Sequence, residues 1–256
     1  MNVLLAEQND AGVRLLTLNR PNKRNALNIE LLETLAQDLR RSEQDPTVRC
    51  IILAGDEHAF SAGADIHEML ERGPAVFASP LRKAAWNAIE SFSKPLIAAV
   101  EGVAFGGGNE LVLLADIVVA GQGARFGQPE VAIGGMPGDG GTQRLIRSVG
   151  KGAAMQMILT GKPVSATDAY RLGLVTRLCP MGSAVAEARI IAGEIAAAAP
   201  LAVRNAKQSL LAALELPLAE GLKAERRAML ELVATFDREE GMAAFAEKRK
   251  PRFQGR

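Results

Sequence analysis

The sequence has few residues of the types that hold metals, form disulfides or stack against nucleic-acid bases. Its 256 residues include two cysteines, two histidines, one tryptophan and one tyrosine, and aromatic residues make up only 4% of the chain. Cys50 and Cys179 form neither a metal-ligand spacing nor a disulfide framework. The two histidines argue against a histidine-rich metal site, and the scarce aromatic rings argue against a platform for stacked bases.

An excess of charge of one sign is also absent. Thirty basic and twenty-nine acidic residues give a formal charge of +1. The chain therefore carries no overall basic field that would attract a nucleic acid or an anionic membrane surface. We expect neither a nucleic-acid partner nor a membrane partner.

Long hydrophobic runs are missing too. The longest apolar stretches are interrupted by Glu101, Asn109, Glu110 and Asp116, and none reaches the roughly 18 apolar residues of a membrane span. We see no basic segment followed by an apolar one at the start, and hence no signal peptide. Hydrophobic residues nevertheless make up 48% of the chain and charged ones 23%, which is typical of a folded domain. We expect a cytoplasmic globular protein.

Apolar segments alternate with helical patterns through the first part of the chain. Strands are expected over 13–18, 48–53 and 95–100, and a further strand starts at Asp116. A helix is expected from about Asn28, because its apolar residues recur at helical spacing. Buried strands that alternate with helices favour an α/β fold with parallel pairing.

The pattern changes near residue 166. Residues 165–168 form a capping box, and residues 175–179 give one last strand signal. Helices are expected over 184–199, 201–214 and 218–236. We divide the chain into a core with the functional site, 1–195, and a C-terminal helical region, 196–256. Leucine and methionine stripes of such helices usually face a core or a subunit interface.

A glycine-rich segment, Phe105–Glu110, lies between an apolar strand and an apolar helix. Its three glycines allow a ligand to approach the backbone closely. The free N–H groups at the helix start can stabilise an anion or a developing oxyanion, and Glu110 in the first turn could project over that place. A tight strand-to-helix turn without further function explains the segment equally well.

Two further segments carry similar signals. Residues 60–66 are mostly small and expose backbone N–H groups, although a strand-exit loop whose Asp65 caps the next helix is the plainer interpretation. Residues 126–144 contain another glycine-rich loop, which Glu130 precedes. Two carboxylates, Glu110 and Glu130, could act as acid and base on one water if they met in space. Otherwise Glu130 is an exposed acid in a loop, and spacing alone does not decide.

In their order and context these segments resemble the enoyl-CoA hydratase/isomerase family, the crotonases. The resemblance runs from residues 20–27 to residues 247–249, and is strongest to bacterial hydratases of fatty-acid and phenylacetate breakdown. It implies a core of ββα units wound as a spiral, and a C-terminal helical part that trimerises, with two trimers stacked into a hexamer. It also implies an acyl-CoA thioester substrate, whose coenzyme A is part of the substrate, and neither a separate cofactor nor a metal.

The resemblance assigns roles residue by residue. It implies an oxyanion hole made of the backbone N–H groups of Ala64 and Gly107. It implies that Glu110 and Glu130 hold the water that is added across the 2,3-double bond; we assign Glu130 as the acid that protonates C2 and Glu110 as the base. By family position, the contacts with CoA fall on Lys23, Arg24, Ala26, Ala62, Asp65 and Ile66. Basic residues near the C-terminus of a neighbouring subunit reach the CoA phosphates in relatives, and Lys248 or Lys250 could do so here.

Two positions depart from the family pattern. Asp139 stands where close hydratases usually carry a small residue, beside Gly138, which in family hydratases lies by the catalytic water. A third carboxylate there could raise the pKa of its neighbours, or act as a base or nucleophile, as an aspartate of this loop does in aryl-CoA dehalogenases of the family. We favour a simpler hypothesis, in which Asp139 caps the helix that starts near Gly141. The other departure, Asn109, could make the acyl pocket more polar.

We therefore predict an enoyl-CoA hydratase, a lyase that forms 3-hydroxyacyl-CoA. An enoyl-CoA isomerase, or another family reaction that uses Asp139, is the alternative. Some members of the family bind RNA, but the near-neutral charge and the few aromatic residues argue against this here. A straight short acyl chain, a branched one and one with a terminal carboxylate all remain open.

Overall fold

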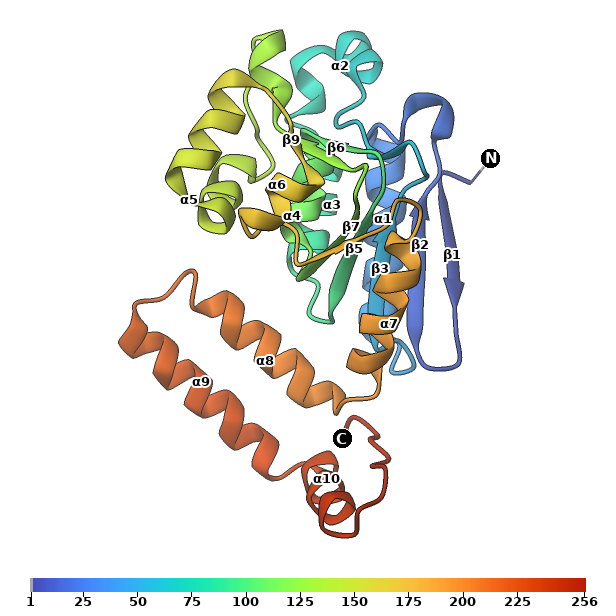
Figure 1. Ribbon diagram of the computed structural model, residues 1–256, viewed down its shortest axis with the longest axis vertical. Helices are drawn as coiled ribbons and strands as arrows, with labels where there is room; N and C mark the ends of the chain where they lie inside the picture. The colour runs from blue at the N-terminus through green and yellow to red at the C-terminus, as the bar shows by residue number, and fades with distance from the viewer. Residues whose placement is uncertain (1) are drawn as a thin grey trace.

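A six-stranded sheet forms the centre of the fold in the computed structural model, which describes residues 2–256 (Figure 1). Its strands, in spatial order, are β1 (Leu4–Gln8), β2 (Val13–Leu18), β3 (Cys50–Ala54), β5 (Leu96–Val100), β7 (Ile117–Gly121) and β10 (Arg177–Cys179). Every neighbouring pair is parallel except β1 and β2. This confirms the parallel α/β fold that the apolar segments predict, while β1 carried no signal that we recognised.

After each of three strands in the large sheet, the chain continues into a strand of a second, smaller sheet. Its strands, in spatial order, are β4 (Ala59–Ser61), β6 (Val103–Phe105), β8 (Arg125–Gly127) and β9 (Val164–Ser165). The strands β3, β5 and β7 lead into β4, β6 and β8, which pair in parallel with one another. The chain therefore winds as a spiral in which each turn contributes one strand to each sheet, as the family resemblance implies.

Seven helices fill the turns of the spiral. They are α1 (Ile29–Gln44), α2 (Ile66–Arg72), α3 (Pro80–Glu90), α4 (Gly107–Leu114), α5 (Gly141–Thr160), α6 (Ala166–Arg171) and α7 (Ala184–Ala196). Polar caps fix four of their starts, because the side chains of Asn28, Asp65, Ser79 and Ser165 accept backbone N–H groups of the first turn. The caps at Asp65 and Ser165 confirm two local predictions. The core lies on both faces of the six-stranded sheet, where β3 and β5 bury every residue.

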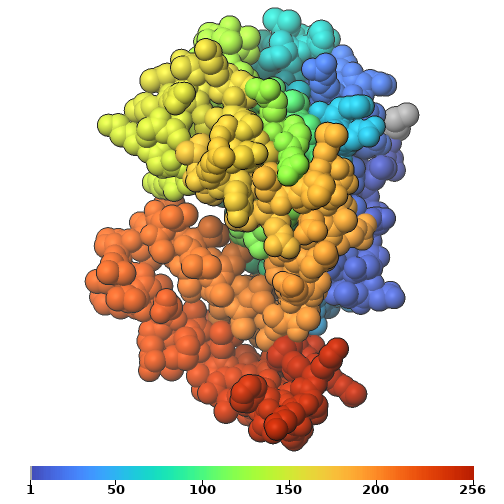
Figure 2. Space-filling model, in the orientation of Figure 1, coloured from blue at the N-terminus to red at the C-terminus, as the bar shows by residue number. Residues whose placement is uncertain are grey.

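Three helices extend from the spiral at the C-terminal end: α8 (Pro200–Ala212), α9 (Leu218–Val233) and α10 (Phe236–Ala246). The prediction of one helix over 218–236 is wrong at its end. The Thr235 hydroxyl accepts the N–H of Arg238 and starts a new helix there. Figure 1 shows α8 and α9 as an antiparallel pair, and Figure 2 shows the C-terminal part, in orange and red, extending from one end of the molecule. Within residues 2–256, no helix combines the length and apolar character needed to cross a membrane.

Candidate active site

Two unpaired backbone N–H groups face each other where β4 and β6 end. Gly63 and Gly106 have φ angles of 99° and 50°, which favour glycine, and Gly107 begins α4. Within residues 2–256, the N–H groups of Ala64 and Gly107 donate to no protein acceptor. A Cβ atom placed on Gly107 would lie 3.8 Å from the nitrogen of Ala64. The two donors are therefore close enough to bind one oxygen atom together, as an oxyanion hole requires.

Glu110 lies in the first turn of α4 and is only 2% exposed. Its Oε1 atom accepts the backbone N–H groups of Asp139 and Gly141, both at 2.8 Å. The close approach needs a glycine at 141, because a Cβ atom there would lie 3.0 Å from Oε1. Burial raises the pKa of Glu110 to about 7 although both N–H groups oppose the shift, and the charge of Asp139 adds to it. The carboxylate can therefore take up or release a proton near neutral pH.

Glu130 lies across the glycine turn from Glu110. A 3₁₀ helix, Pro129–Ile133, follows β8 and presents Glu130. A Cβ atom on Gly106 would lie 3.1 Å from Glu130 Oε1, and one on Gly107 would lie 3.9 Å from Glu110 Oε2. Glu130 Oε2 is buried and has no hydrogen-bond partner in the described part of the chain. Burial raises the pKa of Glu130, and the charge of Asp139 acts in the same direction. The structure thus brings together the two carboxylates that spacing alone could not connect.

Asp139 does not cap the helix that follows it, so that hypothesis is wrong. The N-cap of α5 is Gly140, and no side chain bonds to the first turn. The carboxylate of Asp139 forms an ion pair with the guanidinium of Arg82 on α3 instead. An ion pair with a buried guanidinium is stronger than a hydrogen bond to a neutral N–H group. This explains why the Asp139 carboxylate pairs with Arg82 and does not cap α5. Burial raises the pKa of Asp139, and the charge of Arg82 opposes the shift.

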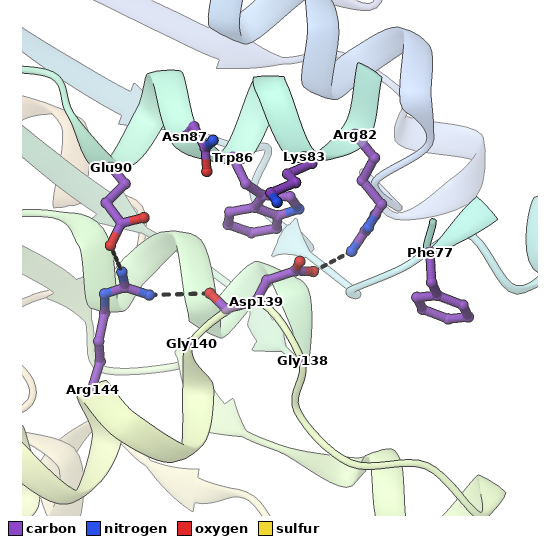
Figure 3. A pocket seen from close by; sticks show the side chains of 10 residues that line it. All are labelled: Phe77, Arg82, Lys83, Trp86, Asn87, Glu90, Gly138, Asp139, Gly140 and Arg144. Carbon is purple, nitrogen blue, oxygen red and sulfur yellow. Dashed lines mark hydrogen bonds and ion pairs between the residues drawn. The ribbon is translucent and has the colours of Figure 1, made fainter. Parts of the chain in front are cut away.

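A cavity of about 310 Å³ lies between α3 and the loop 138–140 (Figure 3). Arg82, Lys83 and Trp86 line it from the side of α3, and Gly138 and Asp139 from the side of the loop. It adjoins the carboxylate pair, because the N–H of Asp139 that bonds to Glu110 belongs to this loop. The cavity is small for a ligand pocket, for which about 300–1,000 Å³ is usual.

Comparison with known proteins agrees with this geometry. A sequence model of the family described as "Enoyl-CoA hydratase/isomerase" matches residues 8–256. The chain belongs to this family. It is 47% identical to the "2,3-dehydroadipyl-CoA hydratase" of Escherichia coli (strain K12), over 95% of this chain and 96% of that protein. It is 45% identical to a "Probable enoyl-CoA hydratase" of Rhizobium meliloti (strain 1021), over 98% of both chains. A crystal structure of enoyl-CoA hydratase from Bacillus anthracis superposes with a TM-score of 0.95, at 35% identity and 100% coverage of both chains.

The segments to which the family assigns CoA contacts lie side by side in this family member. The N–H of Ala62 donates to the carbonyl of Arg24 at 2.9 Å, and the N–H of Leu27 donates to the carbonyl of Gly63 at 2.7 Å. Lys23, Arg24, Ala62 and Ile66 are exposed, and Ala26 is half-buried.

Asp65 differs from the other residues with a predicted CoA contact, because its carboxylate already bonds to groups of the protein. One oxygen pairs with Arg20 at 2.8 Å, and the other caps α2. The side chain therefore fixes the loop that carries Ala64, and its oxygens are not free for a ligand.

Sequence analysis missed several residues around the site. Arg82 and Trp86, four residues apart on α3, line the cavity, and this spacing is the only local signal they give. Gln128 is fully buried beside Gly141, where a Cβ atom would lie 2.7 Å from Gln128 Nε2. The amides of Gln128 and Asn109 have no hydrogen-bond partner within residues 2–256. The family pattern already singled out Asn109, whereas nothing in the local sequence distinguishes Gln128 from an ordinary polar residue. Among the same residues, no group of three or more acidic, histidine or cysteine side chains is placed to hold a metal ion.

Proposed function

We propose that this site adds water across the 2,3-double bond of trans-2-enoyl-CoA thioesters and forms 3-hydroxyacyl-CoA. The chain is an enoyl-CoA hydratase, a lyase, like the relatives that it matches along almost its whole length. One observation carries the assignment of the site: Glu110 and Glu130 flank the two unpaired N–H groups of Ala64 and Gly107. This arrangement offers an acid, a base and an oxyanion hole around one small space.

The two N–H groups supply the electrophilic half of the mechanism. The thioester oxygen accepts the N–H groups of Ala64 and Gly107 and gains negative charge as water attacks C3. Donors that are fixed before the reaction stabilise this enolate-like state more than the ground state. The loss of one such donor costs about 3–4 kcal/mol of transition-state stabilisation in comparable sites.

The two carboxylates supply the proton transfers. Glu110 takes a proton from the water as its oxygen bonds to C3, and Glu130 gives its proton to C2. The N–H groups of Asp139 and Gly141 hold Oε1 of Glu110, so Oε2 is left to face the water. After burial and the charge of Asp139, the charge of Glu130 also helps to raise the pKa of Glu110. Both transfers use side chains of this chain, and the mechanism therefore needs no cofactor beyond the CoA of the substrate.

A reaction that uses Asp139 as a free base or nucleophile has less support. Its carboxylate is tied to Arg82, and a guanidinium partner lowers the nucleophilicity and basicity of a carboxylate. An isomerase would need one carboxylate to move a proton between two carbons, without a second one to hold water. The presence of both Glu110 and Glu130 favours hydration.

The C-terminal helices support a homotrimer, or a hexamer made of two trimers. Neither α8 nor α9 contains a buried residue. Large apolar side chains that are exposed on α8, α9 and α10 include Leu210, Leu218, Leu222, Leu230, Met242 and Phe245. Exposed apolar areas of this extent mark interaction surfaces, and a second copy of this chain is the partner that the family pattern implies.

The remaining parts of the proposal concern the contacts with CoA, the cellular location and the metabolic role. The exposed loop residues Lys23, Arg24, Ala62 and Ile66, together with Ala26, contact CoA, and Lys248 or Lys250 of a neighbouring subunit reaches its phosphates. Asp65 takes part by fixing this loop through Arg20. A cytoplasmic location and a role in fatty-acid β-oxidation complete the proposal.

The first experiment follows the conjugated enoyl-thioester absorbance of crotonyl-CoA, with the product identified by mass. Loss of absorbance with one added water supports the hydratase, and Glu110→Gln is the matched control that should remove the activity. A product of unchanged mass with a shifted double bond would replace the hydratase by an isomerase. No reaction from a folded oligomer that binds CoA would overturn both.

A further inference from the structure

We propose that the cavity between α3 and the loop 138–140 selects an enoyl group whose far end carries a carboxylate, and that Lys83, with Trp86 and Asn87 beside it, binds this carboxylate. The inference rests on the proposed function, since it names the class of acyl chain that the hydratase prefers. It concerns residues outside the acid–base pair and the oxyanion hole.

The position of the cavity suits the distal end of an acyl chain. Asp139 lines the cavity with its side chain, while its backbone N–H bonds to Glu110. The loop that lines the cavity therefore also holds the carboxylate that activates water on C3. A chain that continues from C3, away from the oxyanion hole, meets the residues of α3 after a few carbons.

The charges in the cavity leave one positive group without a partner. Three cationic and two anionic side chains line it: Arg82, Lys83, Arg144, Glu90 and Asp139. Arg82 pairs with Asp139 and Arg144 pairs with Glu90. Lys83 forms no ion pair and no side-chain hydrogen bond within the described residues. A bound carboxylate would complete the set of charges.

One uncharged polar group next to Lys83 lacks an acceptor. Trp86 is 7% exposed, and its indole N–H has no hydrogen-bond partner in the described chain. Asn87 is exposed and its side-chain amide makes no hydrogen bond within the described residues, so it is free to donate to a bound carboxylate. Figure 3 shows Lys83, Trp86 and Asn87 on one stretch of α3 beside the cavity. A hydrocarbon end would leave a buried donor unsatisfied, which costs free energy, whereas carboxylate oxygens accept from it.

The test compares two substrates of equal chain length, trans-2-hexenoyl-CoA and its analogue with a terminal carboxylate. We expect a higher kcat/KM for the carboxylated substrate, and we expect the advantage to shrink as ionic strength rises, since salt screens an exposed lysine. Lys83→Gln should lower the ratio of the two kcat/KM values about fivefold, which corresponds to about 1 kcal/mol. Lys162→Gln, at an exposed lysine outside the cavity, should leave the ratio unchanged.

Three results would overturn the inference. Equal kcat/KM values for the two substrates, with hexenoyl-CoA hydrated well, would remove the carboxylate preference and leave the hydratase standing. An equal rise of KM for both substrates in Lys83→Gln would place Lys83 on the CoA moiety instead. If neither these substrates nor crotonyl-CoA were hydrated, the proposed function and this inference would both fall. Lys83 is exposed, so its substitution leaves the core packing unchanged.

Discussion

The spiral core and the C-terminal helices bury their residues to opposite degrees. In the core, β3 and β5 bury every residue, whereas α8 and α9 bury none. Both regions are rich in apolar residues, so the difference lies in what covers them. The core covers itself through its two sheets and their helices, and it contains the whole candidate site. The C-terminal helices carry apolar surface that only another molecule can cover.

This contrast predicts that the acid–base pair and the oxyanion hole of the proposed hydratase form without assembly, whereas the CoA contact of Lys248 or Lys250 needs it. Each site group is fixed by contacts within the core, as the N–H groups of Asp139 and Gly141 fix Glu110. None of these contacts involves residues of α8, α9 or α10. The following predictions test the separation, from the largest expected effect to the smallest.

Removal of either catalytic carboxylate should abolish turnover without disturbing assembly. We expect Glu110→Gln or Glu130→Gln to lower kcat for crotonyl-CoA by about 10²–10⁴-fold, the usual contribution of a general acid or base. Stopped-flow or steady-state absorbance measures the loss, and light scattering should show an unchanged oligomer. Near-normal turnover in either variant would contradict the two-carboxylate mechanism.

Charged substitutions on α9 should disturb assembly while the core stays folded. Leu222 and Leu230 are 54% and 51% exposed, so the double variant Leu222→Asp, Leu230→Asp removes side chains that are only about half covered within one protomer. We expect it to sediment as a smaller species while its circular dichroism keeps the signature of the folded core. Leu222→Met is the matched control and should assemble normally. An unchanged oligomer in the aspartate variant would exclude α9 from the interface.

Within the core, Glu110 should lower the stability of the protein as the pH rises. Its pKa increases from an ordinary value of 4.5 to about 7 on folding, so the folded state binds more protons than the unfolded state between these values. The free energy of unfolding therefore falls through this range, by up to about 3 kcal/mol for this group. We expect Glu110→Gln to raise Tm at pH 8 and to have little effect at pH 4. A Tm difference independent of pH would refute this assignment.

The smallest effect concerns Asp139. Its negative charge raises the pKa of both Glu110 and Glu130, so Asp139→Asn should lower them. The acidic limb of the profile of kcat/KM against pH should then move to lower pH by about half a unit. Thr142→Ser, at an uncharged residue in the first turn of α5, should leave the limb in place. A shift toward higher pH would contradict this effect of the Asp139 charge on the two glutamates.

Local signals in the sequence predicted much of the fold. The strand at 13–18 and the helix that Asn28 caps lie where the pattern placed them, because alternation, periodicity and caps depend on near neighbours. The boundary at Thr235 was missed, because an apolar periodic pattern continues through it. The family resemblance supplied the pairing of Glu110 with Glu130, which no local pattern contains.

Contacts between distant segments could not be predicted in this way. Arg82 and Asp139 are separated by 57 positions, and the capping hypothesis for Asp139 considered only the helix that follows it. The burial of the Gln128 amide was equally invisible, because burial depends on which turns of the spiral stack. Residues that the sequence analysis missed around the site come mainly from α3, a helix whose position only the three-dimensional fold defines.

The strand order of the large sheet affects how the chain can fold while it is being synthesised. From β1 to β10, the spatial order follows the order of synthesis, so each new strand finds its hydrogen-bonding neighbour already made. The sheet can therefore grow at one edge while translation continues, and no strand waits for a partner that has yet to be synthesised. The apolar helices α8 to α10 leave the ribosome last, when the core behind them is complete. The strands of the core can therefore pair before the exposed apolar side chains of these helices are synthesised.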